Sequence, residues 1–113
     1  MSRRSSLMMV VPPPVRQSLR RLGANLKTAR LRRNLSLDTV ATKIGIDPRV
    51  VADAERGRPS TDIAVYMSLL WVYGLLKTAE DLAAPEIDRM GIILASLGDR
   101  PGKRTISGFG DDL

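Results

Sequence analysis

The stretch of sequence that decides the fold runs from Leu35 to Gly57 and reads LSLDTVATKIGIDPRVVADAERG. Ser36 is a typical cap for a short helix, and Asp47 followed by Pro48 is a typical start of a second helix. Only a tight turn at Gly45 joins the two, and it is too short to let them lie antiparallel. We therefore expect these helices to cross.

A crossing of this kind needs a small residue where the helices meet, a residue that tolerates positive φ in the turn, and a branched apolar residue that points back. Ala41, Gly45 and Val51 supply these in order. Further apolar residues fill the inner positions: Val40, Ile44, Ile46 and Ala54. The spacing is that of a helix-turn-helix motif, whose second helix enters the major groove of DNA.

Further helices are predicted on both sides of this pair. Residues 15–33 carry apolar side chains at helical spacing, and Asn34 tolerates the left-handed conformation that ends many helices. Ser60-Thr61-Asp62 begins a fourth helix that ends at Gly74, and Thr78 begins a short fifth. The expected inner face of the first helix is Leu19, Leu22, Leu26 and Ala29. That of the fourth is Ile63, Tyr66, Met67, Leu70 and Trp71.

The charge of the chain is concentrated at its beginning. The 113 residues include 18 Lys and Arg against 12 Asp and Glu, which gives a net charge of +6. Residues 1–33 contain nine of the basic residues and no acid. Such a block attracts anionic partners, and nucleic acid is the leading candidate. The alternative is a solvated helix face without a partner.

Composition excludes several kinds of chemistry. The sequence has no Cys and no His, so thiolate or imidazole metal sites and Ser-His or Cys-His catalysis are excluded. Asp111 and Asp112 lie in a glycine-rich tail where nothing fixes their geometry, so we expect no general acid–base role. We expect no enzyme activity, no metal and no cofactor.

No apolar run approaches the ~18 residues that a membrane-spanning helix needs. The apolar residues 7–11 after Arg3 and Arg4 are too few for a signal peptide, and three prolines follow them. We therefore expect a cytoplasmic protein without membrane contact.

Residues 15–82 resemble the Cro/repressor-type, or XRE, helix-turn-helix family. Glu55-Arg56-Gly57 followed by Pro59-Ser60 is similar to the exit from the third helix in that family. The resemblance implies an all-α domain of five helices, with the turn motif formed by the second and third. It also implies an inward-facing ion pair between Arg30 and Glu55.

The segment after this domain is similar to the corresponding region of HipB-like antitoxins. In some of these a short C-terminal strand pairs with its twin across a dimer. The likeness implies a strand at 91–95 with a dimer contact through Gly91, Ile92, Ile93 and Leu94; the alternative is a sixth helix packed on the fifth. For Trp71 we predict a core position, with a dimer contact as the alternative.

Groove-facing positions on the third helix are those opposite Val51 and Ala54. Arg49 is the natural base reader, because a guanidinium forms two hydrogen bonds to guanine. Val50 and Ala52 are placed to contact thymine methyl groups. Asp53 either accepts a hydrogen bond from the amino group of cytosine or forms an ion pair with Arg49 or Arg56 at the surface. The expected contacts to the DNA backbone come from Ser36, Lys43, Arg56 and Arg58.

The sequence departs from the family at several of these positions. Leu37 stands where many members have a polar residue that bridges to a phosphate, and Pro48, Val50 and Ala52 replace polar side chains. We therefore expect few sequence-specific contacts to bases, and we expect contacts to the DNA backbone to provide most of the affinity.

The predicted organisation has four parts: a flexible basic arm at 1–14, the DNA-binding domain at 15–84, a dimerisation segment at 85–97 and a flexible tail at 98–113. The predicted function is a homodimeric repressor that binds a two-fold symmetric operator on the bacterial nucleoid. Resemblance favours the antitoxin of a toxin–antitoxin pair, with a cognate toxin as a further partner. The alternatives are a phage-type or free-standing regulator, and a protein-interaction module that has lost operator reading.

Overall fold

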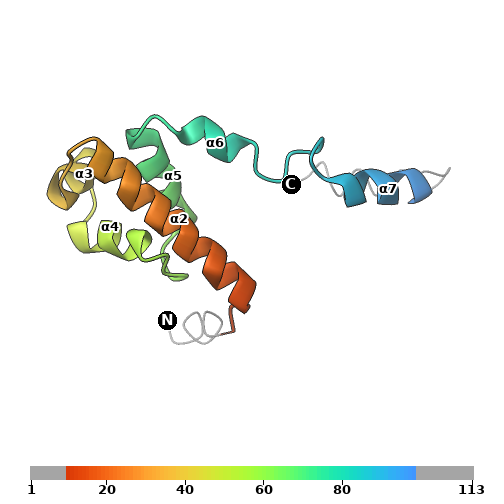
Figure 1. The fold of residues 1–113 in the computed structure, drawn as a ribbon, viewed down its shortest axis with the longest axis horizontal. Helices are drawn as coiled ribbons and strands as arrows, with labels where there is room; N and C mark the ends of the chain where they lie inside the picture. The colour runs from red at the N-terminus through yellow and green to blue at the C-terminus, as the bar shows by residue number, and fades with distance from the viewer. Residues whose placement is uncertain (1–9, 99–113) are drawn as a thin grey trace. The chain divides into compact units, whose positions relative to one another are not determined.

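The computed structural model describes residues 10–98, and within this range every regular element is a helix. Figure 1 shows their order: α2 (Pro13–Arg32), α3 (Leu37–Ile44), α4 (Pro48–Glu55), α5 (Ile63–Val72), α6 (Leu76–Glu80) and α7 (Arg89–Gly98). The all-helical prediction is confirmed for this part of the chain. Most of the predicted arm, the predicted tail beyond Gly98 and the Asp111-Asp112 pair lie outside the described residues.

The chain divides into two compact units between Ala79 and Glu80. The first contains α2 to α5 and most of α6, and the second contains α7. The short fifth helix is present as α6, although it begins at Leu76 rather than at Thr78.

Local capping explains where the helices of the first unit begin and end. The Ser36 hydroxyl accepts a hydrogen bond from the Thr39 amide at 3.0 Å, and this starts α3. The Asp47 carboxylate accepts one from the Arg49 amide at 2.7 Å, and this starts α4. Gly45 ends α3 with φ of 73°, a left-handed conformation that glycine adopts without steric cost. The predicted cap residues are therefore confirmed.

The first helix is slightly longer than predicted. It begins at Pro13, two residues before the expected start, because Pro12 adopts an extended conformation and proline is well tolerated in the first turn. Asn34 follows its end with φ of 55°, as expected for a residue that tolerates the left-handed region.

An aliphatic core forms where α2, α3, α4 and α5 meet. The buried apolar residues are Leu26, Ala29, Val40, Ala41, Val51, Ala54, Tyr66, Leu69 and Tyr73. The inner residues predicted for the turn motif are among them or pack against them. Their burial, at about 25 cal/mol per Å² of apolar surface, is the main stabilising term of this unit.

The predicted inner face of α5 is wrong in part. Tyr66 is buried as expected, but Leu69 and Tyr73 complete the inner face, while Ile63 and Trp71 remain 65% and 62% exposed. The core position predicted for Trp71 is therefore incorrect. The physical reason is that α5 is apolar on nearly every side, so helical periodicity does not single out one face.

Two glycines allow α2 and the end of α4 to touch through their backbones. A Cβ added to Gly23 would lie 2.5 Å from the Ala54 carbonyl oxygen and 2.6 Å from that of Glu55. A Cβ on Gly57 would meet the backbone of Leu19, and Gly57 also has φ of 72°. No larger residue fits at either position without moving the helices apart.

In the second unit, residues 89–98 form a helix, not the strand that the antitoxin likeness implied. Asp88 caps it by accepting a hydrogen bond from the Gly91 amide at 2.9 Å. A helix satisfies its own amides, whereas an isolated strand would leave a row of them unpaired. None of the residues of α7 is buried, and its large apolar side chains are exposed: Met90, Ile92, Ile93, Leu94 and Leu97.

Candidate nucleic-acid interface

Helix α4 presents one face to the core and the opposite face to solvent. Val51 and Ala54 are completely buried, and this fixes the rotation of the helix. On the outer side, the Arg49 side chain is 89% exposed, and Val50 and Ala52 are half-buried. The structure thus places the four predicted base readers, including the half-buried Asp53, around the outer part of α4.

The Arg49 side chain is held by the residue that caps its own helix. One of its terminal nitrogens lies 3.0 Å from the Asp47 carboxylate. The same carboxylate also accepts a hydrogen bond from the Arg49 backbone amide. These hydrogen bonds, first that of the guanidinium and then that of the backbone amide, lower the pKa of Asp47 below its ordinary value. Since both side chains are well exposed, the ion pair is weak, and the guanidinium can exchange it for a base edge.

Asp53 pairs with the basic residues that follow the helix. Its carboxylate lies 3.1 Å from Arg56 and 3.6 Å from Arg58. Of the two interpretations made from sequence, the surface ion pair with Arg56 is therefore present. Both arginine side chains remain exposed, so each keeps donors available for a phosphate.

A buried ion pair fixes the other end of α4. Arg30 Nε lies 2.7 Å from a Glu55 carboxylate oxygen, a second nitrogen donates to the other oxygen at 3.1 Å, and the side chains are 9% and 7% exposed. A further nitrogen of Arg30 donates to the Leu35 carbonyl at 2.9 Å. The hydrogen bonds to Glu55 outweigh burial and raise the pKa of Arg30. The ion pair implied by the family resemblance thus joins α2, α4 and the segment before α3.

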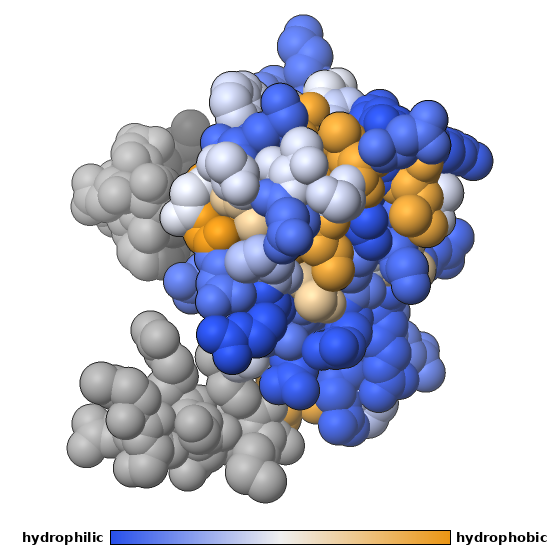
Figure 2. Space-filling view, turned by 90° about the vertical axis from the view of Figure 1, so that its left-hand side faces the viewer, coloured by the Kyte–Doolittle hydropathy of each residue, from blue (hydrophilic) through white to orange (hydrophobic). Residues whose placement is uncertain are grey.

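The remaining predicted backbone contacts lie on α3. Ser36 is exposed at the N-terminus of α3, and Lys43 is exposed in its last turn. Leu37 is half-buried and packs against the core. Figure 2, which shows the side of the molecule where α3 and α4 lie in Figure 1, is mostly hydrophilic with interspersed apolar side chains.

Lys27 also lies at this surface; the sequence indicated the basic first helix as a whole but did not single out Lys27. A groove of about 220 Å³ lies beside α4, with Lys27 and Arg56 as its exposed cations. Its other lining residues are Arg30, Leu37, Ala52 and Glu55. The helical offset of three residues between Lys27 and Arg30 could have indicated that Lys27 points to this side of α2.

Arg33 was also missed, and its role is structural. Its guanidinium donates to the Ala29 and Tyr73 carbonyls, both at 2.9 Å, and lies 5.6 Å from the centre of the Tyr73 ring. Burial, the main cause, raises the pKa of Tyr73 to about 12. Arg33 thereby ties the end of α2 to the end of α5.

Residues 10–98 contain no cluster of three or more carboxylates placed to hold a metal ion. Within the same range, no helix combines the length and the hydropathy that crossing a membrane requires.

A family model described as helix-turn-helix, of the XRE type, matches residues 26–74. The match spans the last turns of α2 and all of α3, α4 and α5, which are the elements that enclose the core. This part of the chain is therefore similar to helix-turn-helix domains of the XRE type. The match is to the family and does not extend to a HipB-like subgroup. No curated protein and no solved structure matches the chain.

Proposed function

We propose that the protein is a DNA-binding transcription regulator that presents the outer face of α4 to the major groove. The observation that carries this proposal is the position of Arg49, which projects from α4 within the span that matches the helix-turn-helix model. The excess of basic residues at the start of the chain supports it, because such a block favours polyanionic partners.

In this proposal the side chains around the outer part of α4 have distinct roles. Arg49 leaves Asp47 to form two hydrogen bonds with guanine, and Val50 and Ala52 contact thymine methyl groups. Asp53 either accepts a hydrogen bond from cytosine or holds Arg56 in position through their ion pair. The DNA backbone is bound by the exposed polar and basic side chains around α4: Ser36, Lys43, Arg56 and Arg58.

We further propose a homodimer that binds a two-fold symmetric operator and acts as a repressor. Exposed apolar surface on Trp71 and on α7 supports self-association, because apolar surface of this kind is a common feature of protein interfaces. The predicted dimer residues Gly91, Ile92, Ile93 and Leu94 would then act from a helix. Replacing Ile93 by Asp should shift the sedimentation mass from dimer towards monomer.

The matched control is Ser96→Asp, which adds the same charge to an exposed position of α7. If both variants keep the dimer mass, Ile93 is not part of the interface. Trp71→Ala would then test whether the interface lies at Trp71.

A narrower proposal follows from the likeness to HipB-like antitoxins: repression of the protein's own operon and capture of a cognate toxin. A phage-type or free-standing regulator is the alternative. The identity of the neighbouring gene separates these, because an antitoxin is expected beside its toxin.

The test of the proposed function is selection of duplexes from a random library, followed by binding measurements over a salt series. We expect log affinity to fall steeply and linearly with log salt for selected and random duplexes alike. Arg49→Ala should reduce the preference for the selected duplex by about tenfold or more, because one bidentate contact to guanine is lost.

Two variants sharpen this test. Arg49→Lys keeps the charge but not the bidentate geometry, so it should reduce the preference while retaining the affinity for random duplex. Arg21→Gln removes an exposed charge from α2 and should leave the preference unchanged. If no duplex is selected over random sequence, the protein-interaction alternative is favoured. If Arg49→Ala keeps the full preference, the assignment of the reader is wrong.

A further inference from the structure

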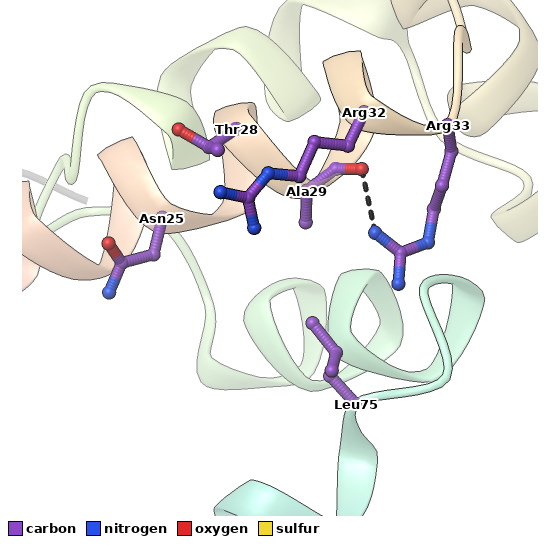
Figure 3. Close-up of a pocket in the computed structure, with 6 residues that line it drawn as sticks. All are labelled: Asn25, Thr28, Ala29, Arg32, Arg33 and Leu75. Atoms are coloured by element: carbon purple, nitrogen blue, oxygen red, sulfur yellow. Dashed lines mark hydrogen bonds between the residues drawn. The ribbon is translucent and has the colours of Figure 1, made fainter.

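A second concave site lies on the first unit, away from α4. It is a pocket of about 360 Å³ between the last turns of α2 and the connection from α5 to α6 (Figure 3). Its lining residues are Asn25, Thr28, Ala29, Arg32, Arg33 and Leu75. This volume falls within the range of pockets that hold small ligands.

The position of the pocket separates it from the proposed DNA-binding face. A helix turns 100° per residue, so Arg32 lies about 160° around α2 from Arg30, which faces Glu55 of α4. Asn25, Thr28 and Arg32 follow one another at intervals of three and four residues on this far flank. No residue of α3 or α4 lines the pocket.

The chemistry of the lining is rich in donors and has no acid. Figure 3 shows the Arg32 and Arg33 guanidinium groups entering the space beneath α2, with the Asn25 side chain at one end. Arg33 is fixed there by its hydrogen bonds to two backbone carbonyls. Arg32, by contrast, has no carboxylate within ion-pair distance among residues 10–98, so its donors are available.

The apolar part of the lining indicates what kind of anion fits. Ala29 and Leu75 contribute aliphatic surface beside the two guanidinium groups. A free inorganic anion would use only the charged part of the pocket. An anion that carries a compact apolar group would use both parts.

We propose that this pocket binds a small organic anion, a carboxylate or a phosphate monoester with a compact apolar body. Arg32 is the recognition side chain, Arg33 is a pre-organised second cation, and Asn25 and Thr28 supply neutral hydrogen bonds. The inference goes beyond DNA binding and does not depend on it. A bound anion would link the end of α2 to Leu75, in addition to the tether through Arg33.

The test is a titration of the ¹⁵N-labelled full chain, with amide resonances recorded by NMR. The probes are phenyl phosphate, inorganic phosphate and sodium chloride at matched ionic strength. We expect saturable shifts at the residues that line the pocket. Phenyl phosphate should bind about tenfold more tightly than inorganic phosphate, because its ring buries apolar surface.

Arg32→Gln should weaken phenyl phosphate binding by about tenfold or more, because a charge-assisted hydrogen bond is lost. Arg21→Gln is the matched control: Arg21 is exposed, lies within about 20° of Arg32 around α2, and is outside the pocket. It should bind the probe as the parent does. Thermal unfolding supplies a second measurement, since at the same ligand concentration the ligand should raise the Tm of the parent and of Arg21→Gln more than that of Arg32→Gln.

Three results would overturn the proposal. Equal weakening by Arg21→Gln and Arg32→Gln would indicate diffuse attraction to a basic helix. Unsaturable shifts, the same for phosphate and chloride, would mean that there is no site. If a short duplex shifts the same amides and phenyl phosphate does not, the pocket belongs to the DNA-binding surface.

Discussion

Helices α4 and α7 are similar in length but opposite in how they use their apolar residues. Helix α4 contains two acids and an arginine, yet it buries Val51 and Ala54 completely. Helix α7 is mostly apolar, yet none of its residues is buried. Apolar content therefore does not determine burial here; α4 is buried because α2, α3 and α5 supply a complementary surface.

The contrast also separates two kinds of surface, for which we propose different partners. The orientation of α4 is fixed by a buried ion pair and a direct backbone contact, so its outer residues are held in defined positions for recognition. None of the apolar side chains of α7 is buried among the described residues. We therefore propose a second copy of the chain as the partner of this surface.

The largest expected effect concerns the contact between α2 and α4. Gly23→Ala should destabilise the fold by about 3 kcal/mol or more, because the added methyl group meets three backbone atoms that cannot move independently. Gly45→Ala is the control: it has open space around the added group and a left-handed φ, and should cost about 1–2 kcal/mol. Both are measured by denaturant unfolding. A Gly23→Ala variant no less stable than Gly45→Ala would contradict the close packing of α4.

The next effect concerns the buried ion pair. Glu55→Gln leaves the Arg30 guanidinium buried without its carboxylate, and should cost about 3 kcal/mol. Asp53→Asn, which removes exposed ion pairs on the same helix, should cost less than about 1 kcal/mol. Denaturant unfolding at neutral pH compares the two. Similar small costs would mean that Arg30 and Glu55 do not orient α4.

A smaller effect is expected from Tyr73, whose hydroxyl is buried without a hydrogen-bond partner within the described residues. Tyr73→Phe should stabilise the protein by about 1 kcal/mol at neutral pH, because an unsatisfied polar group is removed.

The same residue predicts an alkaline pH dependence. Burial holds the pKa of Tyr73 at about 12 in the folded chain, above the ordinary value of 10.0. Between these values the unfolded chain loses the proton and the folded chain keeps it, so stability should fall as pH rises from about 10 to about 12. Thermal unfolding over this range checks the sign. A Tyr73→Phe variant with the same alkaline slope as the parent would show that Tyr73 is not its source.

The smallest expected effect is that of α7 on the core of the first unit. Ile93→Asp should change the exchange protection of the buried amides in α4 and α5 by less than about 0.5 kcal/mol, as should the Ser96→Asp control. Hydrogen exchange is measured at a concentration where sedimentation shows a single mass. A marked loss of protection in Ile93→Asp alone would mean that α7 stabilises this core. Helices α4 and α7 would then not differ in the way described here.

The sequence predicted the turn motif well because its signals are local. Ser36, Asp47 and Gly45 act within one turn of the residues they cap, so their types and spacing carry the information. The pairing of Arg30 with Glu55 spans 25 residues, and it was expected from the family resemblance and not from spacing.

Other features depend on tertiary structure and were not accessible in this way. The close approach at Gly23 becomes evident only when α4 lies against α2. Trp71 was misplaced because α5 is apolar on nearly every side, and residues 90–95 remained open between helix and strand because a short apolar run fits either. The roles of Arg49, Val50, Ala52 and Asp53 toward DNA remain predictions.

We propose above all that the outer face of α4 is the surface that meets DNA. Its most direct test is to add a short duplex to the ¹⁵N-labelled protein and record which amides shift. We predict the largest shifts at Asp47 to Asp53, with smaller ones at Ser36 and Lys43, and none in α7 at concentrations where the mass does not change. Shifts confined to α7 or to the far flank of α2, with α4 unperturbed, would contradict the claim.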